Sequence, residues 1–337
     1  MSSPLIRRPL TVAGVILAAI GLVVLAPVWV PLTAMLDLAR GRWTCPTTRF
    51  AAFGLCWCWL ETAGVSVAGA LWLVGQGRNQ RLHYGLQRWW AARLIGSLRL
   101  TLGMGIDVEG AEHLGRGPFI ALCRHASLAD ALISAWVFGT HARLRPRYVL
   151  KKELSMDPCL DIVGHRLPNY FVDRQSSNVA AELQGIERMA DHLAEGDVAV
   201  IFPEGTRANP RKRARELERL ARRSPERAAR LGDLVHLMPP KPAGAGALLA
   251  AVPGANVLTM WHVGFDGLDT FSGILKHLGR SKVRARIVIE EHVRSTVAAG
   301  EGFIGWLDAQ WLEMDASVSR ILSGAGSAPG HTGGIHG

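Results

Sequence analysis

His125 and Asp130 stand five positions apart in the stretch "LCRHASLAD" (122–130), and their side chains could serve as a base and its orienting acid. On one continuous helix, five residues advance about 500°, which leaves the two side chains roughly 140° apart and unable to meet. They can meet only across a bend. The run "PFIALC" (118–123) predicts a strand ending just before His125, and Ser127 can cap a helix beginning "LADALI". The histidine would then lie in the turn and the aspartate in the first helical turn.

A structural interpretation of the same stretch stays open. Ser127 and Asp130 form a capping-box-like pair, which explains the aspartate without any catalysis. The two roles do not exclude each other. One carboxylate oxygen can hold an imidazole N–H while the other accepts from a backbone amide.

Two further polar clusters follow predicted strands, in "NYFVDRQ" (169–175) and "VIFPEGTRANP" (200–210). Ligands of open α/β sheets bind at the carboxyl ends of the strands, so three clusters could converge on one site. The alternative is that each acid and arginine at a strand end forms only a local salt bridge. The residues concerned are Asp173, Arg174, Glu204, Gly205, Thr206 and Arg207.

Short β-rich runs alternate with helical patterns beyond residue 105. Strands are predicted at 118–123, 148–150, 169–172, 197–202, 256–263 and 283–290. Apolar residues at helical spacing predict a helix over 179–193, which ends by Gly196. This alternation is typical of an α/β sandwich with a mostly parallel central sheet.

The amino-terminal part is apolar enough to enter a membrane. Residues 9–36 contain no charge, and at about 1.5 Å per helical residue they exceed a hydrocarbon core of roughly 30 Å. A cleaved signal peptide is the alternative, but its apolar region should be only about 7–15 residues long. Pro27 and Pro31 are expected to kink or end the helix.

A second apolar run, 51–75, is interrupted by Glu61, so it either spans or only dips into the bilayer. Arginines before the first run and after the second place both ends in the cytoplasm if both runs span. Arginines in the connecting loop weaken that orientation, and a re-entrant hairpin would keep the loop inside as well.

Residues 79–104 mix tryptophans and leucines with arginines, which predicts an amphipathic helix lying in the membrane interface. An ordinary amphipathic helix docked on the domain is the alternative. The five cysteines show no zinc or disulfide spacing and are expected to be reduced.

The charge of the chain is concentrated in one segment. Residues 207–230 hold ten Lys and Arg against three Glu, which accounts for seven of the ten net positive charges. Ser224-Pro225-Glu226 predicts a break between two short helices. Because aromatic stacking residues are absent, we expect an anionic membrane surface rather than nucleic acid as the partner, with a solvated face as the alternative.

"RHASLAD", "YFVDR" and "FPEGTR", in this order and spacing, resemble the three signature blocks of the lysophosphatidic acid (1-acylglycerol-3-phosphate) acyltransferases, which are glycerolipid acyltransferases. "LMPPKPAGAGALLAA" and "WLDAQWLEMDA" are similar to the branch of the YihG-type proteins and lysocardiolipin acyltransferases. Two departures stand out: Arg124 replaces the Asn that commonly precedes the histidine, and the proline-rich fourth block is only loosely matched by "VLTMWHVGFDG". Arg124 either alters the surroundings of His125 or adds a phosphate contact.

The resemblance implies a role for each cluster. His125 would be the general base and Asp130 would orient it, with no side-chain nucleophile. Arg174 and Arg207 would bind the acceptor phosphate, Glu204 would bind acceptor hydroxyls or hold an arginine, and Gly205 would allow close backbone approach. The remaining expected substrate contacts are Lys151, Asp173 and Thr206.

The expected organisation has four parts. Residues 1–78 form a membrane anchor of one or two helices, 79–104 the interfacial helix, 105–322 the acyltransferase domain with a basic helical insert at 208–232, and 323–337 a disordered tail. No metal or cofactor is expected, and acyl-CoA or acyl carrier protein would be the co-substrate.

The expected function is transfer of an acyl chain to the sn-2 hydroxyl of lysophosphatidic acid at the cytoplasmic face of a bacterial inner membrane. The alternatives are another acceptor such as lysophosphatidylglycerol or lysocardiolipin, and an inert membrane-binding adaptor. A lipid hydrolase is disfavoured because no G-x-S-x-G elbow is present.

Overall fold

A mixed sheet forms the centre of the computed structural model, which describes residues 3–265 and 284–325. The order of its seven described strands is β1-β7-β6-β2-β5-β3-β4. All neighbouring pairs are parallel except β6 and β7. The strands are β1 (Gly105–Glu109), β2 (Phe119–Cys123), β3 (Arg145–Lys151), β4 (Tyr170–Val172), β5 (Asp197–Ile201), β6 (Asn256–Val263) and β7 (Arg284–His292).

The α/β fold with a mostly parallel sheet is confirmed, and β2 to β7 correspond to the six predicted strands. The sequence analysis missed β1, whose residues "GIDVE" occupy the edge of the sheet and are largely exposed. An edge strand of five residues buries too few apolar side chains to give a clear signal.

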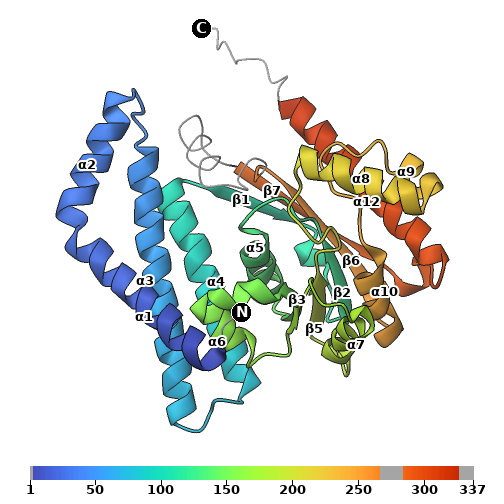
Figure 1. Ribbon diagram of the computed structural model, residues 1–337, viewed down its shortest axis with the longest axis horizontal. Helices are drawn as coiled ribbons and strands as arrows, with labels where there is room; N and C mark the ends of the chain where they lie inside the picture. Colours follow the sequence, from blue (N-terminus) through green and yellow to red (C-terminus); the bar gives the residue numbers. More distant parts are fainter. Residues whose placement is uncertain (1–2, 266–283, 326–337) are drawn as a thin grey trace, which may run out of the picture.

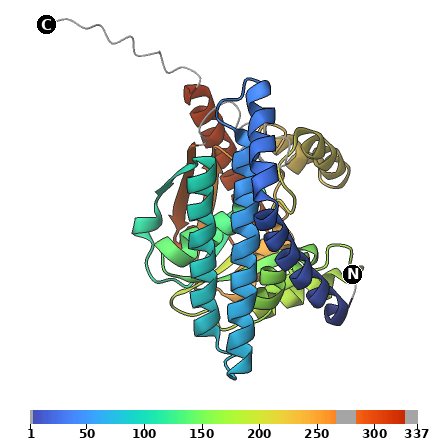
Figure 2. The same cartoon turned by 90° about the vertical axis from the view of Figure 1, so that its left-hand side faces the viewer.

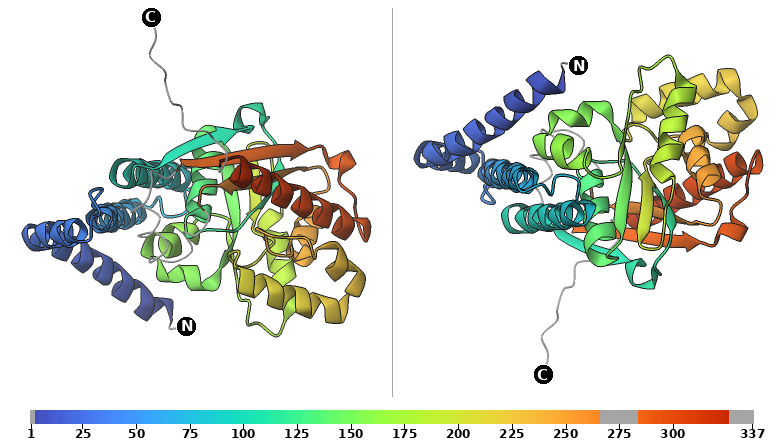
Figure 3. Two further views of the ribbon diagram at one scale, coloured as in Figure 1. Left: turned by 90° about the horizontal axis from the view of Figure 1, so that it is seen from above. Right: turned by 90° about the horizontal axis from the view of Figure 1, so that it is seen from below.

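Helices cover both faces of the sheet (Figures 1 and 3). On one face α4 (Gln80–Leu102) and α5 (Asp130–Trp136) close a core that includes Val198 and Val200 of β5. On the other face α7 (Val179–Ala190), α10 (Pro242–Ala251) and α12 (Gly302–Ala325) pack on Ala199 and Ile201 of the same strand. Alternate residues of β5 thus face opposite cores, as a strand with both faces covered requires.

Short helical segments join some of these elements. They are η1 (Ala111–His113), η2 (Val137–His141), η3 (Lys152–Met156), η4 (Arg294–Thr296) and α6 (Pro158–Gly164). The predicted helix at 179–193 is α7, which ends at Ala190, before the expected stop at Gly196.

The first apolar run is not one helix. It is divided at Leu25 into α1 (Pro4–Val24) and α2 (Ala26–Ala39). Pro27 lies in the first turn of α2, where its missing N–H leaves no bond broken, whereas Pro31 lies inside α2 without ending it. Both helices present large apolar side chains to the exterior, such as Leu17, Val24 and Met35.

By length and composition alone, α1 and α3 (Pro46–Leu73) could each cross a membrane. Yet the middle of α3 is attached to the domain. Glu61 is fully buried and accepts hydrogen bonds from Trp90 Nε1 of α4 (2.9 Å) and from the backbone N–H of Cys159 in α6 (3.0 Å). Figure 2 shows α3 and α4 side by side, with α1 diverging from them.

α4 packs on the domain, as the docked alternative expected. Its residues Ala91, Ile95, Leu98 and Leu102 belong to the main core. Trp89, on another face of the helix, is 37% exposed. The position of this helix at a membrane interface stays a prediction.

The amino-terminal end of α1 is held by an ion-pair cluster. Arg7 Nη2 donates to Asp161 Oδ1 of α6 at 2.8 Å, and Arg8 Nε donates to Asp161 Oδ2 at 3.1 Å. Because Asp161 is fully buried, losing both arginines would leave its charge with only His165 Nδ1, at 3.2 Å, as a partner among the described residues. This cluster joins the anchor to the domain.

The basic segment forms two helices, α8 (Pro210–Arg223) and α9 (Pro225–Arg230), with the predicted break at Ser224. No residue of α8 is buried. The sequence analysis counted Arg227 and Arg230 toward a membrane-binding face. Instead they stabilise the fold, because both pair with the buried Asp308 of α12 at 2.7 Å. Of the predicted tail, residues 323–325 complete α12, and 326–337 lie outside the described residues.

Candidate active site

The histidine and aspartate of the first motif meet across the predicted bend. β2 ends at Cys123 and α5 begins at Asp130, so His125 lies in the turn between them. Its Nδ1 is 2.9 Å from Asp130 Oδ2. The aspartate is fully buried, while the side chain of the histidine is 17% exposed and can be reached from outside. The arrangement can hold one tautomer of the imidazole and leave Nε2 to act as a base.

The pair is present, but the prediction that Ser127 caps the helix is wrong, because the N-cap of α5 is Ala129 and no side chain bonds to it as a cap. Asp130 Oδ2 also accepts from the backbone N–H groups of Ala126 (2.7 Å) and Ser127 (2.9 Å). Ser127 Oγ donates to Asp130 Oδ1 and accepts from the backbone N–H of Ala129 at 3.1 Å. The helix itself begins at Asp130 rather than at Leu128, because these bonds form a turn ahead of it.

A second imidazole faces the same carboxylate. Nε2 of His262, in β6, lies 3.1 Å from Asp130 Oδ1, and both side chains are fully buried. Burial alone would raise the pKa of Asp130, but the charges and hydrogen bonds of His262 and His125 hold that pKa below its ordinary value. The sequence analysis missed His262, which lies within an apolar strand and carries no spacing signal that links it to residue 130.

Arg124, the departure from the family pattern, is a buried residue with 1% of its side chain exposed. Its backbone N–H donates to the carbonyl of Met260 at 2.8 Å, and its Nη1 donates to the carbonyl of His262. This placement favours the expectation that Arg124 changes the surroundings of His125 and gives no support to a phosphate contact.

Glu204, in the turn after β5, is also buried. Its Oε1 accepts from the backbone N–H of His125 at 2.7 Å, and its Oε2 accepts from that of Met238 at 2.9 Å. Burial raises the pKa of Glu204 to about 8, against the effect of these donors and of Arg124. Both oxygens therefore serve the protein, and the geometry does not offer the expected contact with an acceptor hydroxyl.

We expect Glu204→Gln to lower the free energy of unfolding by about 1–3 kcal/mol near pH 4, where the carboxyl is largely protonated in the folded and the unfolded protein alike. The amide would place an N–H group against one of the two backbone donors and leave it unsatisfied. Thermal and urea unfolding would measure this loss. Glu187→Gln, at an exposed position of α7, is the matched control, and equal stability of the two variants would contradict the assigned role of Glu204.

The rest of the third motif forms a tight loop over the pair. Gly205 has φ of +70°, which favours glycine, and the backbone N–H of Ala208 donates to the carbonyl of His125 at 2.8 Å. The ring of Phe202 lies 5.1 Å from that of His125, centroid to centroid. Thr206 Oγ1 is 3.4 Å from Lys212 Nζ at the start of α8. The segment that carries Glu204 and Ala208 thus fixes the backbone of His125 through both its N–H and its carbonyl group.

The charges of Arg174 and Arg207 act on Lys151, and these three predicted binding residues are here called the cationic cluster. Burial, followed by the charges of Arg174 and Arg207, lowers the pKa of Lys151 to about 8. Burial also lowers the pKa of Arg174. Cations brought together against their mutual repulsion can bind a multiply charged anion such as a phosphate monoester.

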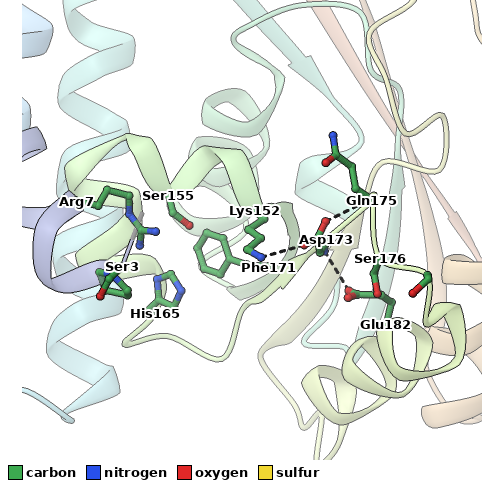
Figure 4. Close-up of a pocket in the computed structure, with 12 residues that line it drawn as sticks. Ser3, Arg7, Lys152, Ser155, His165, Phe171, Asp173, Gln175, Ser176 and Glu182 are labelled. Atoms are coloured by element: carbon green, nitrogen blue, oxygen red, sulfur yellow. Dashed lines mark hydrogen bonds and ion pairs between the residues drawn. The ribbon is translucent and has the colours of Figure 1, made fainter. Parts of the chain in front are cut away.

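Asp173 pairs with a different lysine and lines a cavity whose lining does not include the cationic cluster. Its Oδ2 accepts from Lys152 Nζ at 2.9 Å, and it lines a cavity of about 710 Å³ that Arg7 and His165 border on the other side (Figure 4). The adjacent residues of the second motif therefore diverge. Asp173 pairs with Lys152 at this cavity, and its prediction as a substrate contact stays a prediction.

Comparisons with known proteins agree with the motifs. Residues 105–260 match the family model described as Acyltransferase. The 1-acyl-sn-glycerol-3-phosphate acyltransferase of Saccharomyces cerevisiae is 27% identical over 125 residues, which are 36% of this chain and 39% of the yeast protein. The chain therefore spans about two fifths of that relative. Among solved structures, the 1-acyl-sn-glycerophosphate (LPA) acyltransferase PlsC from Thermotoga maritima matches 80% of this chain and 96% of its own, at 15% identity and a TM-score of 0.42.

Proposed function

We propose that this chain, whose residues 105–260 match the Acyltransferase family model, is an acyltransferase that moves a fatty acyl group from a thioester to the sn-2 hydroxyl of lysophosphatidic acid. The observation that carries the proposal is the pair of His125 and Asp130, joined at 2.9 Å at the carboxyl end of β2. The resemblance of the three motifs supports the acceptor. Placement in the YihG-type branch stays a prediction.

In the proposed reaction, Nε2 of His125 takes the proton from the acceptor hydroxyl as its oxygen attacks the thioester carbonyl. The C–S bond breaks when the tetrahedral intermediate collapses, and the imidazolium returns the proton to the leaving thiolate. Asp130 stabilises the imidazolium and keeps the ring oriented. No covalent acyl-enzyme forms, so neither a serine nor a cysteine nucleophile is required.

The acceptor phosphate would bind the cluster of Lys151, Arg174 and Arg207. Arginine offers a fork of N–H donors that matches phosphate oxygens, and lysine adds a point charge. Thr206 and Gly205, in the loop that carries Arg207, would lie beside it. These contacts would place the sn-2 hydroxyl against His125. Binding of the phosphate would thereby orient the hydroxyl for its attack on the thioester.

Lys151 gives the acceptor affinity a pH dependence. Since the pKa of Lys151 is lowered to about 8, it loses its positive charge as pH rises through that value. We therefore expect the KM for lysophosphatidic acid to rise above pH 8 in the wild type. In Lys151→Arg, which keeps its charge, the KM should stay level to about pH 9. Equal pH dependence in the two proteins would remove Lys151 from the phosphate site.

Membrane association is supported by the exposed apolar surface of α1 and α2 and by the basic helix α8. We propose that α1 and α2 enter the bilayer while α3 stays against the domain through Glu61, and that α8 lies on an anionic surface. The proposed location is the cytoplasmic face of a bacterial inner membrane. Either acyl-CoA or acyl carrier protein would be the donor.

A panel assay tests this proposal. Purified protein in detergent is incubated with lysophosphatidic acid, lysophosphatidylglycerol or lysocardiolipin and with either donor, and the products are identified by mass spectrometry. Phosphatidic acid should form fastest. A larger-headgroup product in excess would favour the alternative acceptor, and binding to anionic vesicles without turnover would favour an inert adaptor.

A further inference from the structure

We infer that His262 is a positioning residue, which fixes the second oxygen of Asp130 so that the first one is directed at His125. This inference rests on the proposed function, because it assigns a part in the same reaction. It also assigns a role to Arg124, which holds the strand that carries His262.

The contacts of Asp130 divide between its two oxygens. Oδ2 meets His125 and two backbone N–H groups, whereas Oδ1 meets only Ser127 Oγ and His262 Nε2 among the described contacts. A carboxylate that is held at one oxygen can still rotate about its Cβ–Cγ bond. The contact of 3.1 Å from β6 restrains that rotation from outside the turn.

His262 is itself held by two contacts besides that with Asp130. Its ring makes an edge-to-face contact with Phe265, with centroids 5.2 Å apart and the planes at 82°. Its carbonyl accepts from Arg124 Nη1, and the backbone N–H of Arg124 donates to Met260 two residues earlier. Arg124 thus spans this part of β6. Neither packing nor sheet bonding requires a histidine at this position, since an apolar residue would fill a fully buried site as well.

The ring nitrogens of His262 point to the same assignment. Within residues 3–265 and 284–325, neither Nδ1 nor Nε2 of His262 makes a hydrogen bond of regular geometry, although Nε2 lies at ion-pair distance from Asp130 Oδ1, at 3.1 Å. A buried polar atom without a partner costs free energy, so the ring is not explained by stability alone. Of the two nitrogens, Nε2 is the one that lies near a charged group, the carboxylate of Asp130.

Three variants separate positioning from packing. His262→Phe keeps the ring volume and loses the nitrogen that faces Asp130, and we expect kcat to fall roughly 10- to 100-fold, as for one lost contact with a charged group, with little change in KM. His262→Gln can present an amide N–H near the same place and should recover most of kcat. His292→Phe, a second sheet histidine that contacts Thr259 rather than Asp130, is the matched control.

The pH profile provides a readout that packing would not move. The titratable and charged groups around His125 and Asp130 are Arg124, Glu204, His262 and Cys123. In His262→Phe, the negative charge of Asp130 is no longer partly balanced by His262. That charge therefore attracts the protonated imidazole of His125 more strongly. The acidic limb of kcat/KM should therefore move to higher pH in His262→Phe and return in His262→Gln.

A double-mutant cycle with Asp130→Asn completes the test. If His262 acts through the charge of Asp130, His262→Phe should cause little further loss of kcat in the Asp130→Asn background. The same loss in both backgrounds, with an unmoved pH profile, would overturn the inference while the proposed function stands. Absence of transfer by the wild type would overturn both. If His262→Phe fails to fold, His262→Asn replaces it, because the shorter amide does not reach Asp130 Oδ1.

Discussion

His125→Ala should reduce kcat for acyl transfer by about 10²- to 10⁴-fold, the usual contribution of a positioned general base. Without the imidazole, the acceptor hydroxyl has no group to take its proton as it attacks the thioester. The KM for lysophosphatidic acid should change little, because the proposed phosphate site lies on other residues. Initial rates of thiol release at saturating acceptor and donor would measure the effect.

The matched control for this variant is His192→Asn. His192 is 95% exposed, and asparagine suits its positive φ of 55°. The control should keep the wild-type rate. A His125→Ala protein that folds and still turns over at near the wild-type rate would show that another group takes the proton.

Asp130→Asn should lower kcat by roughly 10- to 10³-fold, because the amide no longer stabilises the imidazolium that forms when His125 takes the proton. Three N–H donors surround Oδ2, so the amide oxygen should take that position and keep the histidine tautomer. The loss of kcat then measures the contribution of the negative charge of Asp130. Asp107→Asn, at an exposed position of β1, is the matched control.

The same substitution should move the acidic limb of the kcat/KM profile. A carboxylate favours the protonated imidazole, and a neutral amide does not. The limb should therefore shift to lower pH in Asp130→Asn, opposite to the shift expected for His262→Phe. A limb that stays in place would mean that the carboxylate does not act on His125.

Local patterns predicted the parts of this structure that depend on neighbouring residues. The bend between His125 and Asp130 follows from a strand end and a serine three residues before an acid, and the break at Ser224 follows from a capping residue and a proline. The sites of the three polar clusters follow from the rule that ligands bind at strand ends. None of these predictions requires that the order of the strands in the sheet be known.

Other features depend on long-range pairing and could not be predicted in the same way. His262 reaches Asp130 only because β6 lies beside β2, and nothing in the sequence states that order. The same holds for Glu204, which was placed at the site by its motif although its partners are backbone groups of His125 and Met238. The pairing of Arg227 and Arg230 with Asp308 depends on how α9 meets α12, about 80 residues later in the chain.

Membranes that contain the wild-type protein or His125→Ala, incubated with isotopically labelled lysophosphatidic acid and an acyl thioester, test the central claim most directly. The account predicts labelled phosphatidic acid acylated at sn-2 in the wild-type sample, and a yield lower by at least 10²-fold in the variant. Equal yields in the two samples, or no labelled phosphatidic acid in either, would contradict it.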